Sequence, residues 1–319
     1  VRIVEGIEGT VDMRLELVLR FDYGSLVPWV RSLDGALVAV AGPDAVSVRT
    51  PIELEGRNLR THAEFRVREG DRVPFVLTWF PSHRDLPEPV DAEHALDDAL
   101  QYWSDWSRNC KMEGRWRDPV VRSLLTLKAL TYAPTGGIVA AATTSLPEQL
   151  GGVRNWDYRY CWLRDATLTL LAFLRAGYLE EAHRWRDWLL RAMAGSPEDI
   201  QVMYGVAGER RLTEVELPWL AGYEGSRPVR IGNSASDQFQ LDVYGEVIDA
   251  LYLARVKGIT ASDDAWAMTS KVFDWLESDW QEPDEGIWEV RGPRRHFTHS
   301  NVMAWVAFDR ATKAIQKLG

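Results

Sequence analysis

The first 84 residues alternate between apolar and polar side chains with a period of two. In residues 11–21 the odd positions are apolar and most even positions are charged, which predicts a half-buried β-strand. The same pattern predicts further strands at residues 36–40, 45–49, 60–67 and 73–80. Strands that recur about every 10–13 residues, with turn signals between them, favour part of an antiparallel β-sandwich.

From residue 91 the apolar positions recur with the period of an α-helix. Residues 91–108 carry one apolar stripe and predict a connecting helix. Asp118 and Pro119 predict the start of the next helix, as its N-cap and its first helical residue. Counting that helix, six are predicted after the connecting one, at residues 118–132, 164–176, 179–194, 238–257, 262–280 and 300–318.

The two patterns divide the chain into three parts. We predict an α+β, multi-domain protein with a partial β-sandwich at residues 1–84, a linker helix at 85–117 and a helical domain at 118–319. The loop at 195–236 is too long to serve only as a connector. Long loops on a helical scaffold often carry functional sites.

Composition narrows the class of protein. The chain is 46% hydrophobic and 26% charged, as in a soluble globular protein, and its net charge of −10 argues against a nucleic-acid partner. No apolar run is long enough to span a membrane. The two cysteines, Cys110 and Cys161, cannot form a disulfide framework, so we expect reduced thiols in a cytoplasmic protein. Because Val1 opens a strand-like pattern with no signal peptide before it, we expect a fragment whose start lies upstream.

The segment from Asn155 to Asp165, with the sequence NWDYRYCWLRD, concentrates aromatic rings, arginines and aspartates. Flat rings stack on the apolar faces of sugars, and an Arg/Asp pair can bind sugar hydroxyls. Taken alone, the segment could equally be a buried aromatic loop with one structural ion pair.

This segment resembles the first active-site motif of glycoside hydrolase family 15, the family of glucoamylases, trehalases and glucodextranases. The motif reads Asn-x-Asp-Tyr-x-Tyr-x-Trp-x-Arg-Asp, and every fixed position is matched. The resemblance implies an N-terminal β-sandwich followed by an (α/α)6 catalytic barrel. The six predicted helices would be the first half of that barrel, so the chain would be an internal fragment of a longer enzyme.

The resemblance also implies which residue is the general acid. In the family it is the Glu that follows Trp in an Ile-Trp-Glu or Leu-Trp-Glu motif, here Glu289 after Trp288. Desolvation beside Trp288 would raise the pKa of the carboxyl, as an acid catalyst requires. Asp284 and Glu285 are nearby rivals, although acidic residues are common in turns of this kind without any catalytic role.

Substrate-binding residues follow from the same resemblance. Arg164 and Asp165 would hold the terminal glucose, although a charged pair that opens a helix is also ordinary electrostatics. Tyr158 and Trp162 would wall the subsite of that glucose, and Trp288 would add a ring beside it. The loops at 136–163, 195–236 and 281–298 are expected to build one lip that brings these residues together.

A second loop, Gly225-Ser226-Arg227-Pro228, resembles the Trp-Gly-Arg-Pro loop of the family and makes Arg227 a further candidate for substrate binding. The family tryptophan is replaced by Gly225. Because that ring forms part of the subsites of starch enzymes, its loss favours a short substrate such as trehalose or isomaltose.

No cofactor or metal is predicted. His296 and His299 are spaced for ligands only on a helix face, and loop hydrogen bonds or N-capping explain them better. The catalytic base of the family lies near the end of its barrel and is expected beyond Gly319.

We therefore predict a glycoside hydrolase that releases terminal α-linked glucose with inversion from a disaccharide or small oligosaccharide, with no nucleic-acid or membrane partner. The fragment by itself would be inactive. A disaccharide phosphorylase on a similar fold, which needs only one acid carboxyl, and a non-catalytic sugar-binding half-barrel are the alternatives.

Overall fold

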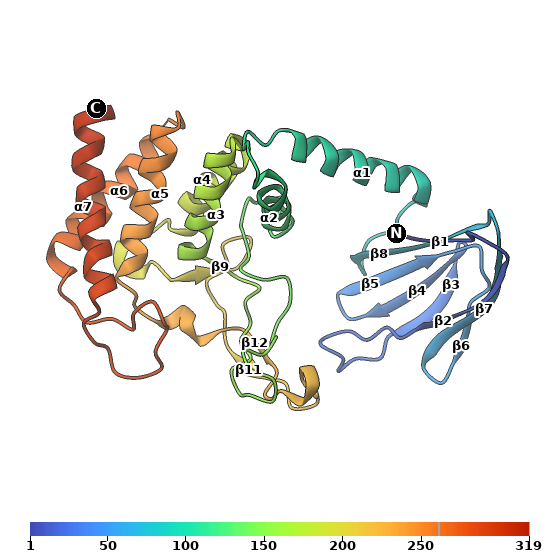
Figure 1. Ribbon diagram of the computed structural model, residues 1–319. Helices are drawn as coiled ribbons and strands as arrows, with labels where there is room; N and C mark the ends of the chain where they lie inside the picture. Colours follow the sequence, from blue (N-terminus) through green and yellow to red (C-terminus); the bar gives the residue numbers. More distant parts are fainter. Residues whose placement is uncertain (261, 319) are drawn as a thin grey trace. The chain divides into compact units, whose positions relative to one another are not determined.

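The computed structural model describes residues 1–260 and 262–318. These residues form two compact units, which divide between Asp105 and Trp106, and each is treated by itself (Figure 1). In the described part of the chain, no helix is both long and apolar enough to cross a membrane.

The N-terminal unit is built from antiparallel strands. They are β1 (Arg2–Glu5), β2 (Thr10–Leu17), β3 (Trp29–Leu33), β4 (Ala36–Ala41), β5 (Asp44–Arg49), β6 (Glu55–Arg57), β7 (Arg60–Arg68) and β8 (Arg72–Pro81). One sheet has the order β1-β8-β5-β4-β3 and a second has the order β2-β7-β6. The two sheets touch through Phe65 and Phe75, whose ring centroids lie 5.7 Å apart.

Four of the predicted strands have nearly their predicted bounds. The strand predicted at residues 11–21 is shorter than expected, because β2 ends at Leu17. Hydrogen bonding in β2 ends at Leu17, where its pairing with β7 also ends at Thr61. Strand β3 was not predicted because all five of its residues are exposed, so no apolar and polar alternation marks it. The short strand β6 was missed as well, whereas β1 lies in the strand-like pattern expected from Val1 onwards.

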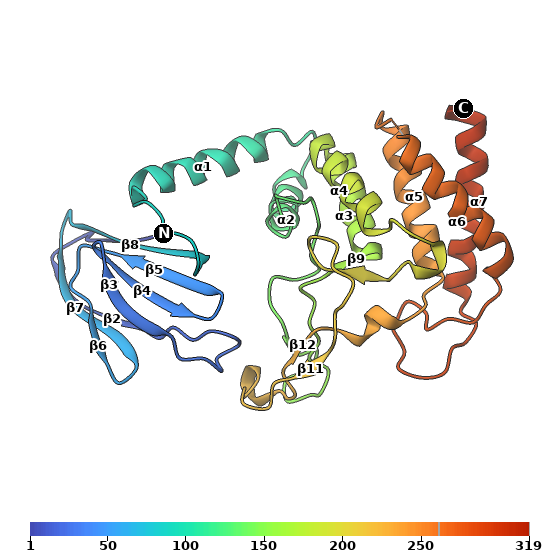
Figure 2. The same cartoon turned by 180° about the vertical axis from the view of Figure 1, so that it is seen from behind.

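The second unit is helical. Helix α1 (Ala92–Arg108) crosses the division between the units, and it is followed by α2 (Arg117–Ala129), α3 (Leu163–Ala176), α4 (Leu179–Ala192), α5 (Asp242–Val256), α6 (Asp263–Asp279) and α7 (Thr298–Leu318). Helix α3 packs against α5, and α5 packs against α7, while α4 and α6 pack against each other and against α3 and α7 respectively (Figure 1, and Figure 2 from behind). The core of this unit contains large, fully buried rings, including Trp185, Trp188, Phe173 and Tyr204.

Two predicted helix starts were wrong. Asp118 is not an N-cap, because α2 begins at Arg117 and its cap position, Trp116, makes no side-chain cap bond. The turn at Gly114, whose carbonyl accepts from the Arg117 amide, starts the helix earlier. Helix α5 begins at Asp242 rather than at residue 238, because the amides of Phe239 and Leu241 donate to side chains of another loop.

Helix ends agree better with the prediction. Gly177 caps α3 with a left-handed φ of 92°, and its amide donates to the Phe173 carbonyl. Antiparallel sheets in one region and helices in the other confirm the α+β class. The short strands β9 (Cys161–Trp162), β10 (Met203–Tyr204), β11 (Val215–Glu216) and β12 (Arg230–Ile231) lie in the loops between helices.

Candidate active site

The segment from Asn155 to Asp165 has two structurally different halves. In the first half, Asn155 and Asp157 are completely buried. The Asn155 amide donates to the carbonyls of Gly152 and Pro228, at 3.0 and 3.2 Å. The Asp157 carboxylate accepts from Arg159 and, at 3.1 Å, from the Gly232 amide. These residues therefore hold two loops together and are closed to a ligand.

The second half of the segment opens onto a cavity of about 800 Å³, a size typical of small-molecule sites. The predicted residues that line it are Tyr158, Trp162, Arg164, Asp165, Trp288 and Glu289. Asn233 and Ala235 contribute from the loop at 195–236. The three loops that were expected to form one lip thus meet around a single space, although more than 120 positions separate Arg164 from Glu289.

Glu289 lies at the centre of this polar set. Its Oε1 accepts a 2.7 Å hydrogen bond from Trp162 Nε1 and lies 3.4 Å from Arg164 Nη2. The residue has a φ of 53°, in the left-handed region that non-glycine residues seldom adopt. Backbone strain of this kind often occurs at functional sites, where the surrounding structure fixes a side chain in one direction.

The surroundings of Glu289 favour its protonated form. Burial raises the pKa of the carboxyl above its ordinary value of 4.5, and the nearby charge of Asp165 adds to the increase. Contacts with Trp162, Arg164 and Gln240 oppose it without cancelling it. A carboxyl that keeps its proton above the usual range can act as a general acid.

Arg164 connects Glu289 to the start of α5. Its Nη1 donates to Gln240 Oε1 at 2.9 Å and to Asp242 Oδ2 at 3.2 Å. Asp242 is completely buried, and only 14% of the Arg164 side chain is exposed. The guanidinium is therefore fixed in direction before any ligand binds.

Asp165 follows Arg164 in the first turn of α3. Its side chain lines the cavity. Desolvation raises the pKa of Asp165, and the charge of Arg164 acts in the opposite direction.

Aromatic rings line one wall of the cavity. The rings of Tyr158 and Trp162 are 5.5 Å apart and tilted by 50°. Burial, reinforced by the charges of Glu148 and Glu289, raises the pKa of Tyr158 to about 12, so its hydroxyl remains a neutral donor. Trp288 is 84% exposed, which leaves most of its ring available for stacking on a sugar.

Trp156 lies at the rim of the same cavity. The guanidiniums of Arg230 and Arg291 lie over its ring, at 4.6 and 4.1 Å from the centroid, a cation–π arrangement. Arg291 also makes two hydrogen bonds to Glu214, at 3.1 and 2.7 Å. Arg230 in turn pairs with Glu216 at 3.1 Å, so the charges of the cluster balance and its contacts fix the rim.

Arg227 is not among the residues that line the cavity. It is exposed, and its Nε donates to the Ala221 carbonyl at 3.3 Å. Its role in substrate binding stays a prediction from the resemblance alone.

The rival carboxylates have structural partners. Buried Asp284 accepts from the Leu241 amide at 2.9 Å and from Ser300 Oγ at 2.7 Å. Glu285 accepts from the Phe239 amide and from Arg294. Both residues therefore hold the start of α5 against the loop that carries Glu289.

The residues that the sequence interpretation missed are polar groups that support the predicted ones: Gln240, Asp242 and Glu148. The first two lie near the start of the helix that the sequence predicts at residues 238–257, where no role in the site was assigned to them. Within the described residues, no group of three His, Cys, Asp or Glu side chains could hold a metal ion. His299 instead lies 3.9 Å from Asp242.

Comparisons with known proteins agree with the motif. The family model of the glycosyl hydrolases family 15 matches residues 114–319. The chain is 40% identical to a trehalase of Mycobacterium tuberculosis (strain ATCC 25618 / H37Rv), over 100% of this chain and 48% of that protein. It is 39% identical to a trehalase of Mycolicibacterium smegmatis over 100% of this chain and 49% of that one.

A more distant relative is trehalase 1 of Sulfolobus acidocaldarius, with 32% identity over 98% of this chain and 55% of the relative. The chain thus spans about half the length of the curated relatives that it matches. The family expected from the segment between Asn155 and Asp165 is confirmed.

Proposed function

The chain belongs to the glycosyl hydrolases family 15, and from this premise we propose that the whole protein hydrolyses trehalose, with inversion at the attacked carbon. The observation that carries the proposal is Glu289. Its carboxyl is partly buried, with 23% of the side chain exposed. Its pKa is raised, and it faces a cavity that also contains a fixed guanidinium and four aromatic rings.

In the proposed reaction Glu289 donates its proton to the oxygen that links the two sugars. The bond between that oxygen and C1 breaks, and its electron pair stays with the leaving glucose. Water adds to C1 from the opposite face and gives a proton to a base. The family resemblance assigns this base to a glutamate outside these 319 residues.

The remaining residues hold the sugar. We assign Arg164 and Asp165 to the hydroxyls of the terminal glucose, because both face the cavity and Arg164 is fixed by Gln240 and Asp242. Tyr158 and Trp162 would pack against its apolar face, and Trp288 would stack on the second ring.

The same premise extends to the fold. We propose that α2 to α7 are half of an (α/α)6 barrel and that the two sheets are part of a β-sandwich. The domain bounds would then be 1–84, 85–117 and 118–319. The consecutive packing of α3, α5 and α7 supports the barrel.

Trehalose is preferred to starch for two reasons. The relatives with high identity are named trehalases, and Gly225 stands where starch enzymes of the family have a tryptophan. One of the weaker matches, an isomaltose glucohydrolase of Kribbella flavida at 27% identity over 43% of this chain, makes isomaltose the second candidate.

The test uses the full-length protein with trehalose, isomaltose, maltose and soluble starch. Early proton NMR spectra should show one β- and one α-glucose per trehalose, because inversion changes only the attacked carbon. Two α-glucoses would contradict inversion. Glucose 1-phosphate formed only when phosphate is added would indicate a phosphorylase instead.

Replacing the acid tests the central residue. Glu289→Gln keeps the shape of the side chain but removes the proton donor, so kcat should fall by about 10²–10⁴-fold with little change in sugar binding. Activity within about tenfold of wild type would remove Glu289 from the role of acid.

A further inference from the structure

A second carboxylate lies behind Arg164, on the side away from the cavity. Asp242 opens α5, is completely buried, and accepts from Arg164 Nη1 at 3.2 Å. The other terminal nitrogen of the same guanidinium lies 3.4 Å from Glu289. One cation is therefore shared between the proposed acid and a buried carboxylate that does not line the cavity.

The contact with Asp242 offsets an unfavourable effect of Arg164 on Glu289. A guanidinium next to a carboxyl favours the ionised form of that carboxyl, yet a general acid must start the reaction protonated. Asp242 supplies a negative charge to the same guanidinium at short range. In a buried site, where screening is weak, this charge offsets the pull of Arg164 on Glu289.

The charges around the pair come from several elements. Asp242 faces Arg164 from α3 and His299 from α7, at 3.9 Å. Its charge also acts on Glu246 of α5 and on Asp284 of the following loop. Glu289 faces Arg164 and Asp165 from α3 and Tyr158 from the preceding loop. Among the residues that the structure describes, Arg164 is the permanent cation in contact with both carboxyls.

We propose that Asp242 is a positioning residue that holds Arg164 and offsets its charge, so that Glu289 carries its proton into the reaction. The inference rests on the proposed function, because it needs Glu289 to be the acid.

The first test is Asp242→Asn in the full-length enzyme, because the amide oxygen can still accept from Arg164. We expect the alkaline limb of kcat/KM against pH to move to lower pH by about one unit, since Glu289 loses the charge that favours its protonated form. If the Asp242→Asn enzyme is folded and the alkaline limb of its kcat/KM profile stays at the wild-type pH, the proposal is overturned.

Gln240 provides a test in the opposite direction. Its Oε1 accepts from the same Nη1 at 2.9 Å, so Gln240→Glu adds a carboxylate to the guanidinium. The alkaline limb should then move to higher pH. The double variant D242N/Q240E restores the charge balance and should return the limb towards its wild-type position. If Asp242→Asn does not fold, the double variant D242N/Q240E is compared with Gln240→Glu, because the two differ only in the charge at Asp242, and equal alkaline limbs reject the proposal.

Glu181→Gln is the matched control. Glu181 is a buried carboxylate of α4 that pairs with Lys128 at 3.1 Å and accepts from Trp106 at 2.6 Å, away from the cavity. Its replacement should lower stability while the limb stays in place. A limb that moved equally in this control would show that loss of packing, not charge on Arg164, is the cause.

The two proposals can fail separately. If Glu289→Gln is as active as wild type, the acid assignment fails and the inference fails with it. If Glu289→Gln is inactive but the limb does not respond to Asp242→Asn or Gln240→Glu, only the role of Asp242 is rejected.

Discussion

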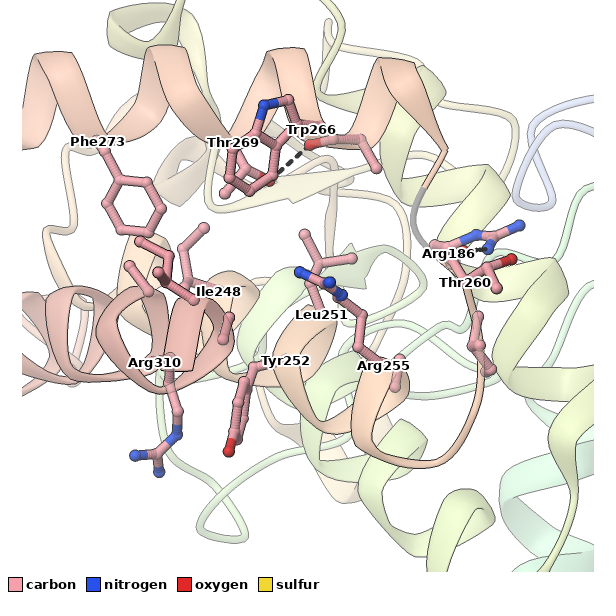
Figure 3. Close-up of a pocket in the computed structure, with 16 residues that line it drawn as sticks. Arg186, Ile248, Leu251, Tyr252, Arg255, Thr260, Trp266, Thr269, Phe273 and Arg310 are labelled. Atoms are coloured by element: carbon pink, nitrogen blue, oxygen red, sulfur yellow. Dashed lines mark hydrogen bonds between the residues drawn. The ribbon is translucent and has the colours of Figure 1, made fainter. Parts of the chain in front are cut away.

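Two of the hollows in the helical unit differ sharply in chemistry. The cavity around Glu289 measures about 800 Å³ and collects carboxyls, guanidiniums and rings. The groove between α5, α6 and α7 measures about 130 Å³, and Ile248, Leu251 and Phe273 are among the side chains that line it (Figure 3). Of the described residues that line this groove, none is acidic.

The polar groups of the two hollows are also used differently. In the groove, Arg186 donates to the Thr260 carbonyl and Thr269 to the Ala265 carbonyl, so these side chains bind backbone groups around the groove (Figure 3). In the cavity, Arg164 and Trp162 direct their donors at one carboxylate. Convergence of polar groups on one point, rather than an apolar hollow, marks a site for chemistry.

The largest effect that would test this contrast is Arg164→Lys. An ammonium cannot reproduce the fork that contacts Gln240, Asp242 and Glu289 together, so kcat/KM should fall by an amount equivalent to about 2–4 kcal/mol. Steady-state kinetics on trehalose measures it, with Arg255→Lys in the groove as the control. An unchanged kcat/KM would make Arg164 a purely structural residue.

A substitution inside the groove should lower stability and leave the kinetic constants unchanged. Ile248 is 4% exposed and lines the groove, so Ile248→Val should lower the free energy of unfolding by about 1 kcal/mol. The kinetic constants should not change, because no groove residue faces the cavity. Denaturant unfolding and kinetics on the same preparation check both halves, and a large loss of activity would link the two hollows.

From the sequence alone, the residues that line the cavity could be predicted, but the residues that hold them in place could not. Tyr158, Trp162, Arg164, Asp165 and Glu289 were found because a family motif fixes their types and order. That their side chains share one cavity is a tertiary fact that only the structure provides.

Asp242 and Gln240 were missed for a physical reason. An aspartate at the start of a helix looks like ordinary N-terminal electrostatics, and nothing local reveals that Arg164 lies against it. The start of helix α5 was likewise predicted four residues too early, because Asp284 and Glu285, more than 40 positions away, bind the amides of Leu241 and Phe239.

A smaller effect concerns stability and pH. The raised pKa of Glu289 means that folding favours its protonated form, so this contribution to stability is complete below its ordinary value of 4.5. The contribution is lost as pH rises through the folded-state pKa. Glu289→Gln should therefore unfold at a higher temperature than wild type at pH 7, with the difference shrinking at low pH. An equal difference at both pH values would mean that titration is not the cause.

The smallest expected effect comes from replacing one exposed tryptophan in each hollow. Trp266 is 57% exposed at the groove, and Trp288 is 84% exposed at the cavity. Because both rings are largely in solvent, either replacement by Ala should change the free energy of unfolding by less than about 0.5 kcal/mol. Trp266→Ala should also leave kcat/KM unchanged, since Trp266 lines the groove and not the cavity.

Trp288→Ala is the matched comparison. Loss of its ring should reduce kcat/KM for trehalose by about tenfold, because the second sugar loses its stacking surface. An aryl or fluoride leaving group has no such sugar, so α-glucosyl fluoride should be hydrolysed by Trp288→Ala nearly as fast as by wild type. Equal losses on both substrates would show that Trp288 acts on the glucose that the two substrates share rather than on the leaving sugar. A loss in Trp266→Ala of similar size would contradict the division between a reactive cavity and a packing groove.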